Sequence, residues 1–277
     1  MLAVHPDLQP EIEEYLLSKK VTIVKLSFVE CDNPVIKVGD QKAAETVGKR
    51  NAQEANTCVA PYPDIKIRWG RYPFLRDMLQ GCDACTGPVL VTDARDVYFQ
   101  RDPFGDGAAA VRGLQVFAEH PHFIDAGHWF VARRVRICKD GYTMDGPMVC
   151  SGTTIGTRDT MLEFLDIMYR EMKLWMTTEQ CLFHSHGGDQ AIMNYLHYSG
   201  HFQDLNPTLY YPRQGTVNTV GVIGLRIVKR LEKQSNYIDN EGYFIEYDGS
   251  RSRIVHQADR FGSDWLKWMK KGDAWKD

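Results

Sequence analysis

The sequence lacks long apolar runs and any large excess of charge of one sign. Its longest apolar segments are far shorter than the roughly 20 residues of a membrane-spanning helix. The first residues, MLAVHPDLQPE, do not have the pattern of a signal peptide. We therefore expect no transmembrane segment in this chain. The 33 basic and 36 acidic residues give a net charge of −3, so no basic field predicts a nucleic-acid partner.

The cysteines lack the spacing of a disulfide scaffold. There are seven of them, an odd number, and only Cys82 and Cys85 form a CxxC pair. With no second CxxC nearby, a zinc site at this pair is not favoured. A reducing compartment is the simpler interpretation, so we expect a cytoplasmic protein. The alternative is the lumenal catalytic domain of a secretory-pathway enzyme whose membrane anchor is not in this chain.

The length and the apolar patterns predict an α/β fold. A chain of 277 residues with 43% hydrophobic residues can bury a sizeable core, as one large domain or two small ones. Alternating strand and helix patterns begin at the N-terminus and continue along the chain. We predict strands at 2–4, 21–26, 148–156 and 217–220, and helices at 10–19, 41–56, 71–79 and 158–172.

Two carboxylates follow a short apolar segment near the middle of the chain. Residues 89–91 (VLV) predict a buried strand, and Asp93 and Asp96 come after it. Ligands bind at the carboxyl ends of strands in open α/β sheets. Two carboxylates are costly to hold together unless a cation neutralises them, so the pattern favours a divalent metal. The alternative is a turn in which Asp93 caps the backbone and Asp96 pairs with Arg95 or Arg101.

A histidine near the C-terminus is a candidate third ligand. Residues 254–255 (IV) lead directly into His256, and imidazole suits Mn²⁺-type ions. We expect residues 242–247 to pair with 254–255 through a turn at Asp248-Gly249 and so deliver His256 to a cleft. The alternative is an ordinary histidine at the surface or at the edge of the core.

A glycine pair precedes an acidic residue at the start of a predicted helix. Gly187 and Gly188 allow close approach of another group to the backbone, and Asp189 is expected to cap a helix that continues to Tyr198. Asp189 is therefore either a cap alone or a cap that also faces a ligand. His184 and His186 precede it and form an H-x-H pair, which favours a flexible loop over a metal site.

Four motifs occur in a distinctive order: Asp93-Ala-Arg-Asp96 followed by Val-Tyr-Phe, CSGTTIG at 150–156, GGDQAIMNYL at 187–196 and IVHQADR at 254–260. In this order they resemble a glycosyltransferase of the GT-A fold. The middle two are similar to those of the glycogenin-like family eight transferases. The resemblance covers roughly residues 65–260. It implies one GT-A (Rossmann-like) domain over 1–277, with a mixed central β-sheet flanked by helices.

The resemblance also implies a reaction and a set of site residues. The chain would move a sugar from a nucleotide-diphosphate sugar to a hydroxyl of a glycan or other acceptor, with Mn²⁺ or Mg²⁺ as cofactor. Asp189 would be the catalytic residue. The metal ligands would be Asp93, Asp96 and His256. The donor would be bound by Arg71, Asp93, Ser151, Gly152, Gln190 and Arg260.

Two departures from the family pattern leave details open. The family's acidic motif is DxD, whereas Asp93 and Asp96 are separated by two residues, so either carboxylate is the direct ligand. Cys150 stands where the family has an Asn beside the donor sugar. Retention and inversion at the anomeric carbon both remain open, with the family favouring retention. Other candidate functions are a metal-dependent phosphohydrolase and a non-catalytic nucleotide-sugar or carbohydrate-binding protein.

Overall fold

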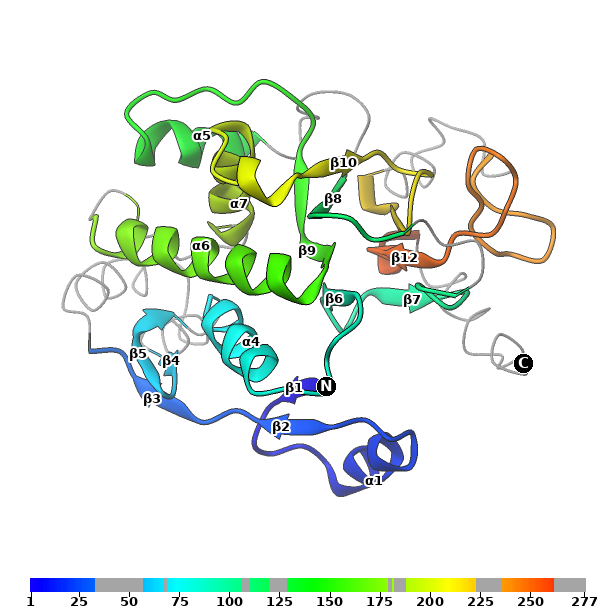
Figure 1. The fold of residues 1–277 in the computed structure, drawn as a ribbon, viewed down its shortest axis with the longest axis horizontal. Coiled ribbons are helices and arrows are strands. Elements are labelled where there is room, and N and C mark those ends of the chain that lie inside the picture. Colours follow the sequence, from blue (N-terminus) through cyan, green and yellow to red (C-terminus); the bar gives the residue numbers. More distant parts are fainter. Residues whose placement is uncertain are drawn as a thin grey trace. The chain divides into compact units, whose positions relative to one another are not determined.

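The computed structural model describes most of the chain, in eight stretches of residues: 1–32, 57–66, 69–105, 110–119, 129–178, 181, 188–222 and 236–261. Figure 1 labels the helices and strands along the chain. The chain divides into two compact units. One consists of Met1–Met78 and Met168–His186, and the other of Leu79–Ile167 and Gly187–Asp277. The single domain expected over 1–277 stays a prediction.

The first unit begins with the predicted strand–helix–strand segment. Strand β1 (Leu2–Val4) pairs in parallel with β2 (Ile23–Lys25), and helix α1 (Pro10–Ser18) connects them. Pro10 is the first residue of α1, where its missing N–H costs no hydrogen bond. This arrangement confirms the βαβ interpretation of the N-terminus.

A three-stranded antiparallel sheet follows in the same unit. Its order is β3-β4-β5, formed by Phe28–Glu30, Thr57–Val59 and Tyr62–Lys66. A disulfide joins Cys31 to Cys58, and both side chains are fully buried. The bond fastens the end of β3 to the middle of β4, two strands that are distant in sequence.

Two long helices contain predicted segments. Helix α4 (Arg71–Gln80) matches the prediction for 71–79, and α6 (Arg158–Met176) begins where expected but is one turn longer. Buried residues recur along α6 at intervals of three and four, which is the spacing of one helical face. They are Met161, Phe164, Leu165, Met168, Met172, Trp175 and Met176.

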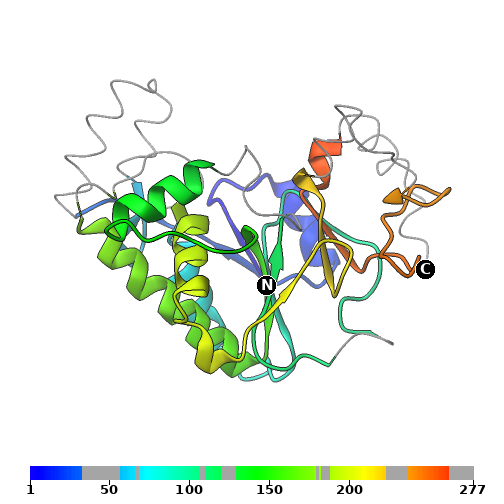
Figure 2. The same cartoon turned by 90° about the horizontal axis from the view of Figure 1, so that it is seen from above.

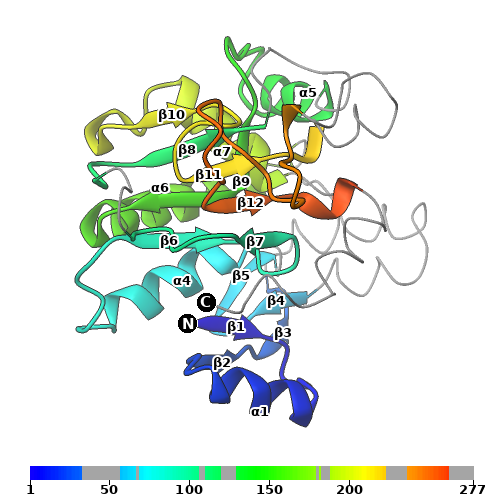
Figure 3. The same cartoon turned by 90° about the vertical axis from the view of Figure 1, so that its right-hand side faces the viewer.

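The second unit contains a four-stranded mixed sheet in the order β10-β8-β9-β6. Its strands are Thr208–Tyr210, Gln115–Ala118, Val149–Gly156 and Val89–Thr92. The β10–β8 pair is parallel, and the other two pairs are antiparallel. In Figure 3 these strands follow one another in sheet order from the top of the view downwards.

A second mixed sheet in this unit has the order β11-β12-β7. Its strands are Val217–Thr219, Ile254–His256 and Val97–Phe99. Strand β12 runs parallel to β11 and antiparallel to β7. Because β6 and β7 are separated only by residues 93–96, the chain crosses there from one sheet to the other.

The helices of the second unit lie beside the four-stranded sheet. Helix α7 (Gly188–Tyr198) contacts β9, and α5 (Trp129–Cys138) contacts α7. In Figure 2 the green α5 and the yellow-green α7 lie on the same side of the central strands. The described residues of this unit also include 3-10 helices at Gln203–Leu205 and Ala258–Phe261.

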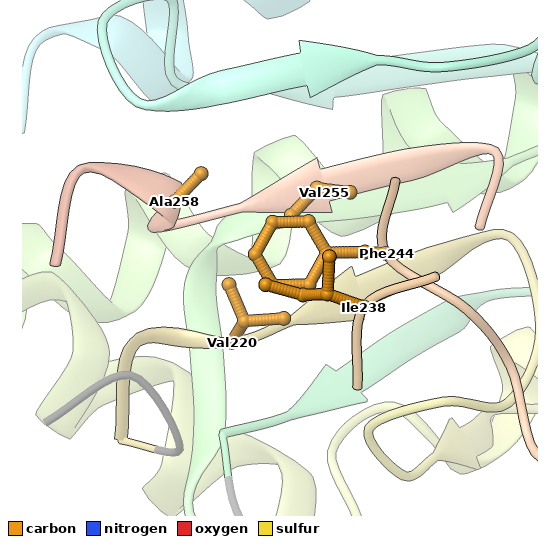
Figure 4. Close-up of a cluster of buried hydrophobic side chains, with 5 residues drawn as sticks. All are labelled: Val220, Ile238, Phe244, Val255 and Ala258. Atoms are coloured by element: carbon orange, nitrogen blue, oxygen red, sulfur yellow. The ribbon is translucent and has the colours of Figure 1, made fainter. Parts of the chain in front are cut away.

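Two apolar clusters join the elements of this unit. Phe117, Ile155, Val217 and Ile254 pack together and connect the two sheets. The second cluster, shown in Figure 4, consists of Val220, Ile238, Phe244, Val255 and Ala258. It fixes the loops between 236 and 251 against β12. The fold is therefore α/β with mixed sheets flanked by helices, which is compatible with a Rossmann-like fold.

Several details of the sequence prediction are wrong. The described strands form four sheets and not one central sheet. In the second unit, the chain leaves the four-stranded sheet after β6 and enters the three-stranded sheet at β7. Strand β6 is only partly buried. Residues 242–247 do not pair with β12, which is flanked by β11 and β7. The turn at Asp248-Gly249 is present, and it joins Ile245 to Arg251.

The cysteines also differ from the expectation. Cys82 is bonded to Cys85, and Cys138 and Cys181 are disulfide-bonded as well, which leaves Cys150 as the free thiol. The CxxC pair is thus a short disulfide loop and not half of a zinc site.

Some predictions lie outside the described residues. They are the helix at 41–56, the His184 and His186 pair, and Gly187. Among the helices that the structure describes, none combines the length and the apolar character needed to cross a membrane.

Candidate metal centre

The backbone brings three predicted ligands together where the two sheets of the second unit meet. Thr92 is the last residue of β6 and pairs with Thr153 of β9, so Asp93 lies beside Gly152 and its N–H donates to the Gly152 carbonyl at 2.8 Å. On the other side of the crossing, Val97 of β7 pairs with His256 of β12. Asp96 therefore lies next to His256.

The side chains of Asp93, Asp96 and His256 converge. Each offers one ligand atom, and these atoms all lie within 4.8 Å of one another. The Nε2 atom of His256 is 3.9 Å from Asp93 Oδ2 and 3.7 Å from Asp96 Oδ1. These separations exceed hydrogen-bond length and are short enough for one cation to bind both atoms of each pair, given metal–ligand bonds of about 2.0–2.2 Å.

His256 is oriented toward the carboxylates and is shielded from water. Its side chain is 1% exposed, and its Nε2 has no hydrogen-bond partner among the described residues. Burial lowers the pKa of His256, although the charges of Asp96 and Asp93 oppose this shift. The neutral ring has a lone pair at one nitrogen, which is the form that binds metals. A buried nitrogen without a partner is costly, and a bound cation would satisfy it.

Gly152 leaves the space between the ligands open. A Cβ atom at this position would lie 2.5 Å from His256 Cε1 and 2.7 Å from Asp93 Oδ2. Both distances are far below van der Waals contact, so any side chain here would displace the ligands. The glycine in the CSGTTIG motif is thus required by close approach of two other side chains to the backbone.

Cys150 contacts the Nδ1 side of the His256 ring. It is fully buried, and its Sγ lies 3.4 Å from His256 Nδ1 and accepts a hydrogen bond from the Gly152 N–H at 3.4 Å. Burial raises the pKa of Cys150 well above its usual value, with a further contribution from Glu119. Cys150 is therefore a neutral thiol against the ring of a candidate ligand.

Glu119 is a site residue that the sequence analysis missed. Its side chain is 2% exposed, and its Oε1 accepts hydrogen bonds from Gln190 at 2.9 Å and Gln257 at 3.1 Å. Gln257 also donates to Cys150 Sγ at 3.8 Å. A buried carboxylate thus links α7 to the segment after β12. Glu119 directly follows strand β8, so the same strand-end rule that indicated Asp93 could have indicated it.

Asp189 lies in the first turn of α7, close to the centre. Helix α7 begins at Gly188, so Asp189 lies inside the helix. The prediction that Asp189 caps the helix is therefore wrong. Ser151 Oγ donates to Asp189 Oδ2 at 3.4 Å. The charge of Asp189 raises the pKa of the largely buried Arg134 on α5, although burial lowers that pKa more strongly. The carboxylate therefore has polar neighbours from β9 and from α5.

The remaining predicted residues are not all in this centre. Arg260 is exposed four residues beyond His256, and its positive charge contributes to the lowered pKa of His256. Gln190 faces Glu119 and the Val149 carbonyl. Arg71 belongs to the first unit, where it donates to the Tyr72 hydroxyl at 3.1 Å and stacks on the Tyr72 ring.

The alternative pairing of Asp96 is not present. Arg101 donates to the carbonyl of Arg251, Arg95 is exposed, and Asp96 faces His256. The carboxylates thus lie where the metal interpretation requires them.

No protein-family model matches this chain, and a search of the curated proteins found no match either. The resemblance to GT-A glycosyltransferases therefore remains a prediction from the sequence motifs.

Proposed function

We propose that this chain is a metal-dependent glycosyltransferase of the GT-A type, which moves a sugar from a nucleotide-diphosphate sugar to a hydroxyl of a glycan or other acceptor. The observation that carries the proposal is the convergence of Asp93, Asp96 and His256 within 4.8 Å. The order of the four sequence motifs supports it independently.

The three ligands fit a divalent cation. Two carboxylates and one imidazole suit Mn²⁺, with Mg²⁺ as the alternative, because both ions prefer oxygen ligands and Mn²⁺ accepts imidazole. When bound, such a cation would stabilise the negative charge that develops on the departing diphosphate. The buried Nε2 of His256, which has no hydrogen-bond partner among the described residues, is the feature that most favours a cation here.

The other residues of the site would act on the two substrates. Ser151 positions Asp189 by a hydrogen bond, and Gly152 leaves room beside the backbone for the side chains of His256 and Asp93. Asp189 would either deprotonate the acceptor hydroxyl, which inverts the anomeric centre, or stabilise the cationic sugar from the other face, which retains it. Arg260 would add a charge-assisted hydrogen bond to the diphosphate.

The proposal is tested by incubating the protein with a panel of nucleotide sugars, Mn²⁺ and candidate acceptors. Release of nucleoside diphosphate that stops on addition of a chelator is the expected result. Release of inorganic phosphate would identify a phosphohydrolase. Saturable binding without either product would identify a nucleotide-sugar or carbohydrate-binding protein.

A direct test of the ligands measures Mn²⁺–nucleotide affinity by calorimetry in His256→Ala. We expect at least a ten-fold weaker affinity, because one of three protein ligands is removed. His201→Ala is the matched control, since His201 is exposed and outside the centre. Unchanged affinity in His256→Ala would show that His256 is not a ligand.

A further inference from the structure

A cavity of about 560 Å³ lies in the second unit, away from the candidate metal centre. Four arginines line it, against two acidic residues, Glu246 and Asp248. The arginines are Arg101, Arg213, Arg251 and Arg253. The volume falls within the range of roughly 300–1,000 Å³ that is typical of small-molecule sites, so the cavity is larger than one inorganic anion needs.

The cavity and the metal centre lie at opposite ends of the same three strands. Thr216 and Arg253 line the cavity and immediately precede β11 and β12, while Arg101 follows the antiparallel β7. His256 ends β12 on the other side. A strand rises about 3.3 Å per residue, so the two sites are roughly 10 Å apart along β12. The cavity is therefore a separate site.

Neutral partners hold two of the arginines in place. Arg213 donates from Nε to the Ile245 carbonyl at 3.1 Å and from Nη2 to the Glu246 carbonyl at 2.9 Å. Arg101 donates from Nη1 to the Arg251 carbonyl at 3.3 Å. Carbonyl groups fix a guanidinium without cancelling its charge. Arg251 differs, because Asp239 and Glu241 form ion pairs with it.

Aromatic contacts and a buried side chain hold part of the cavity wall in place. The guanidinium of Arg213 lies over the rings of Tyr237 and Tyr247, at 5.3 and 4.4 Å from the ring centroids. Phe244, fully buried in the cluster of Figure 4, anchors the loop that carries Glu246 and Tyr247. A preformed site loses less conformational entropy on binding.

Glu246 opposes an anion less than an ordinary glutamate would. Burial raises the pKa of Glu246 to about 7; a hydrogen bond with Ser252 opposes this rise, Asp248 adds to it and Arg213 opposes it. Near neutral pH this side chain therefore carries only part of its negative charge. Asp248 stays ionised, because hydrogen bonds from Ser250 and the charge of Arg101 lower its pKa. Four arginines against Asp248 and a partly charged Glu246 still leave an excess of positive charge in the lining, which favours an anionic group.

We propose that this cavity binds an acidic sugar, a ligand of monosaccharide or disaccharide size whose carboxylate, phosphate or sulfate group is held by Arg101 and Arg213. Arginine forks match such groups in a bidentate geometry. The volume accommodates the sugar ring, and Tyr247, 64% exposed, adds an aromatic surface beside it. The inference does not depend on the proposed transferase activity.

The test is calorimetric titration of the full chain, without metal, with glucuronate, glucose 1-phosphate, glucose, inorganic phosphate and inorganic sulfate. We expect saturable binding of at least one of the two acidic sugars, at least ten-fold tighter than that of glucose, which weakens as salt is added. Arg101→Gln should weaken this binding at least ten-fold. Arg136→Gln is the matched control, since Arg136 is an exposed arginine on α5 outside the cavity, and it should have less than a two-fold effect.

Two results would overturn the proposal. One is binding of inorganic phosphate or sulfate alone, which would identify a site for a free anion. The other is an acidic sugar that binds no better than glucose or that is indifferent to Arg101→Gln. The same titration in His256→Ala separates this inference from the transferase proposal, because acidic-sugar binding should persist when the metal centre is disrupted.

Discussion

A single glycine decides whether the candidate metal centre has room for an ion. Gly152 lies against His256 and Asp93 so closely that a Cβ atom would be 2.5 Å from the histidine ring. His256 is held from the other side by Cys150, so its ring cannot retreat without breaking that contact. The centre is thus built from the backbone of β9 as much as from its three ligands.

This geometry predicts that Gly152→Ala abolishes or strongly weakens metal binding, by ten-fold or more, while the protein still folds. The added methyl group must push His256 or Asp93 out of position. Mn²⁺ affinity measured by calorimetry, with circular dichroism to monitor folding, is the test. Gly87→Ala is the control, because a Cβ at Gly87 meets nothing within 4 Å. An unaltered Mn²⁺ affinity in Gly152→Ala would remove this glycine from the centre.

Asp189 leads to a prediction about chemistry. In Asp189→Asn the side chain can still accept the hydrogen bond from Ser151, but the negative charge is gone. We expect near-normal donor affinity and a kcat lower by roughly two to four orders of magnitude, the scale for a positioned acid–base group.

The matched control for Asp189→Asn is Asp159→Asn. Asp159 is also in the first turn of a helix, and its side chain is 95% exposed. Each change should cost about 0.3–1 kcal/mol of stability through the helix dipole. Turnover near that of the unaltered protein in Asp189→Asn would assign this residue to the helix alone.

At the level of secondary-structure elements, the Gln100 side chain connects the cavity loops to strand β7 by hydrogen bonds. Gln100 follows β7, and its Nε2 donates to the carbonyls of Phe244 and Ser252 at 3.0 Å each. Its Oε1 accepts from the Phe244 N–H at 3.0 Å. These bonds connect residues about 150 positions apart in sequence and replace the strand pairing that residues 242–247 do not make.

We predict that Gln100→Ala lowers the free energy of unfolding by roughly 1–3 kcal/mol, because three hydrogen bonds are lost and backbone groups are left without partners. Chemical denaturation measures this loss. The same substitution at the exposed Gln80 should change stability by less than about 0.5 kcal/mol. Equal effects at the two positions would show that the Gln100 contacts do not stabilise the loop. Acidic-sugar binding should weaken in Gln100→Ala and not in Gln80→Ala.

For the molecule as a whole, most cysteines form disulfides, whereas the sequence led us to expect free thiols. Six of the seven cysteines are disulfide-bonded, and only Cys150 is free. Structural disulfides persist in oxidising compartments. We therefore propose the lumenal location, the alternative in the sequence analysis, in place of the cytoplasmic one. Cys150 stays reduced in this arrangement because it is fully buried against His256.

The disulfides predict a measurable contribution to stability. The Cys31–Cys58 bond spans 27 residues and the Cys82–Cys85 bond spans 3. Loop-closure entropy gives about 3.5 kcal/mol for the first and about 2 kcal/mol for the second. Replacing each pair by serine and measuring denaturant unfolding should reproduce this order. Peptide mapping without reductant tests whether the bonds form. A protein whose stability is the same with and without reductant would argue against structural disulfides.

Much of the local structure and the set of candidate ligands could be predicted from the sequence. Helices α1, α4 and α6 were predicted from apolar periodicity, and strands β9 and β11 from runs of small and β-branched residues. These signals are local, because the apolar residues of one buried helix or strand face recur at a fixed interval within a short segment. The positions of Asp93, Asp96 and His256 at strand ends could be predicted for the same reason.

The pairing of the strands and the surroundings of the candidate ligands depend on long-range packing. Pairing of Val97 with His256, the contact of Cys150 with the histidine ring and the position of Glu119 join segments far apart in sequence. The sequence pattern leaves such pairings open, because any apolar strand face can cover another. The division into several sheets, the disulfide partners and the arginine cavity depend on the same long-range packing. These features are determined by how closely the surfaces of distant segments pack together, which no short stretch of sequence can indicate.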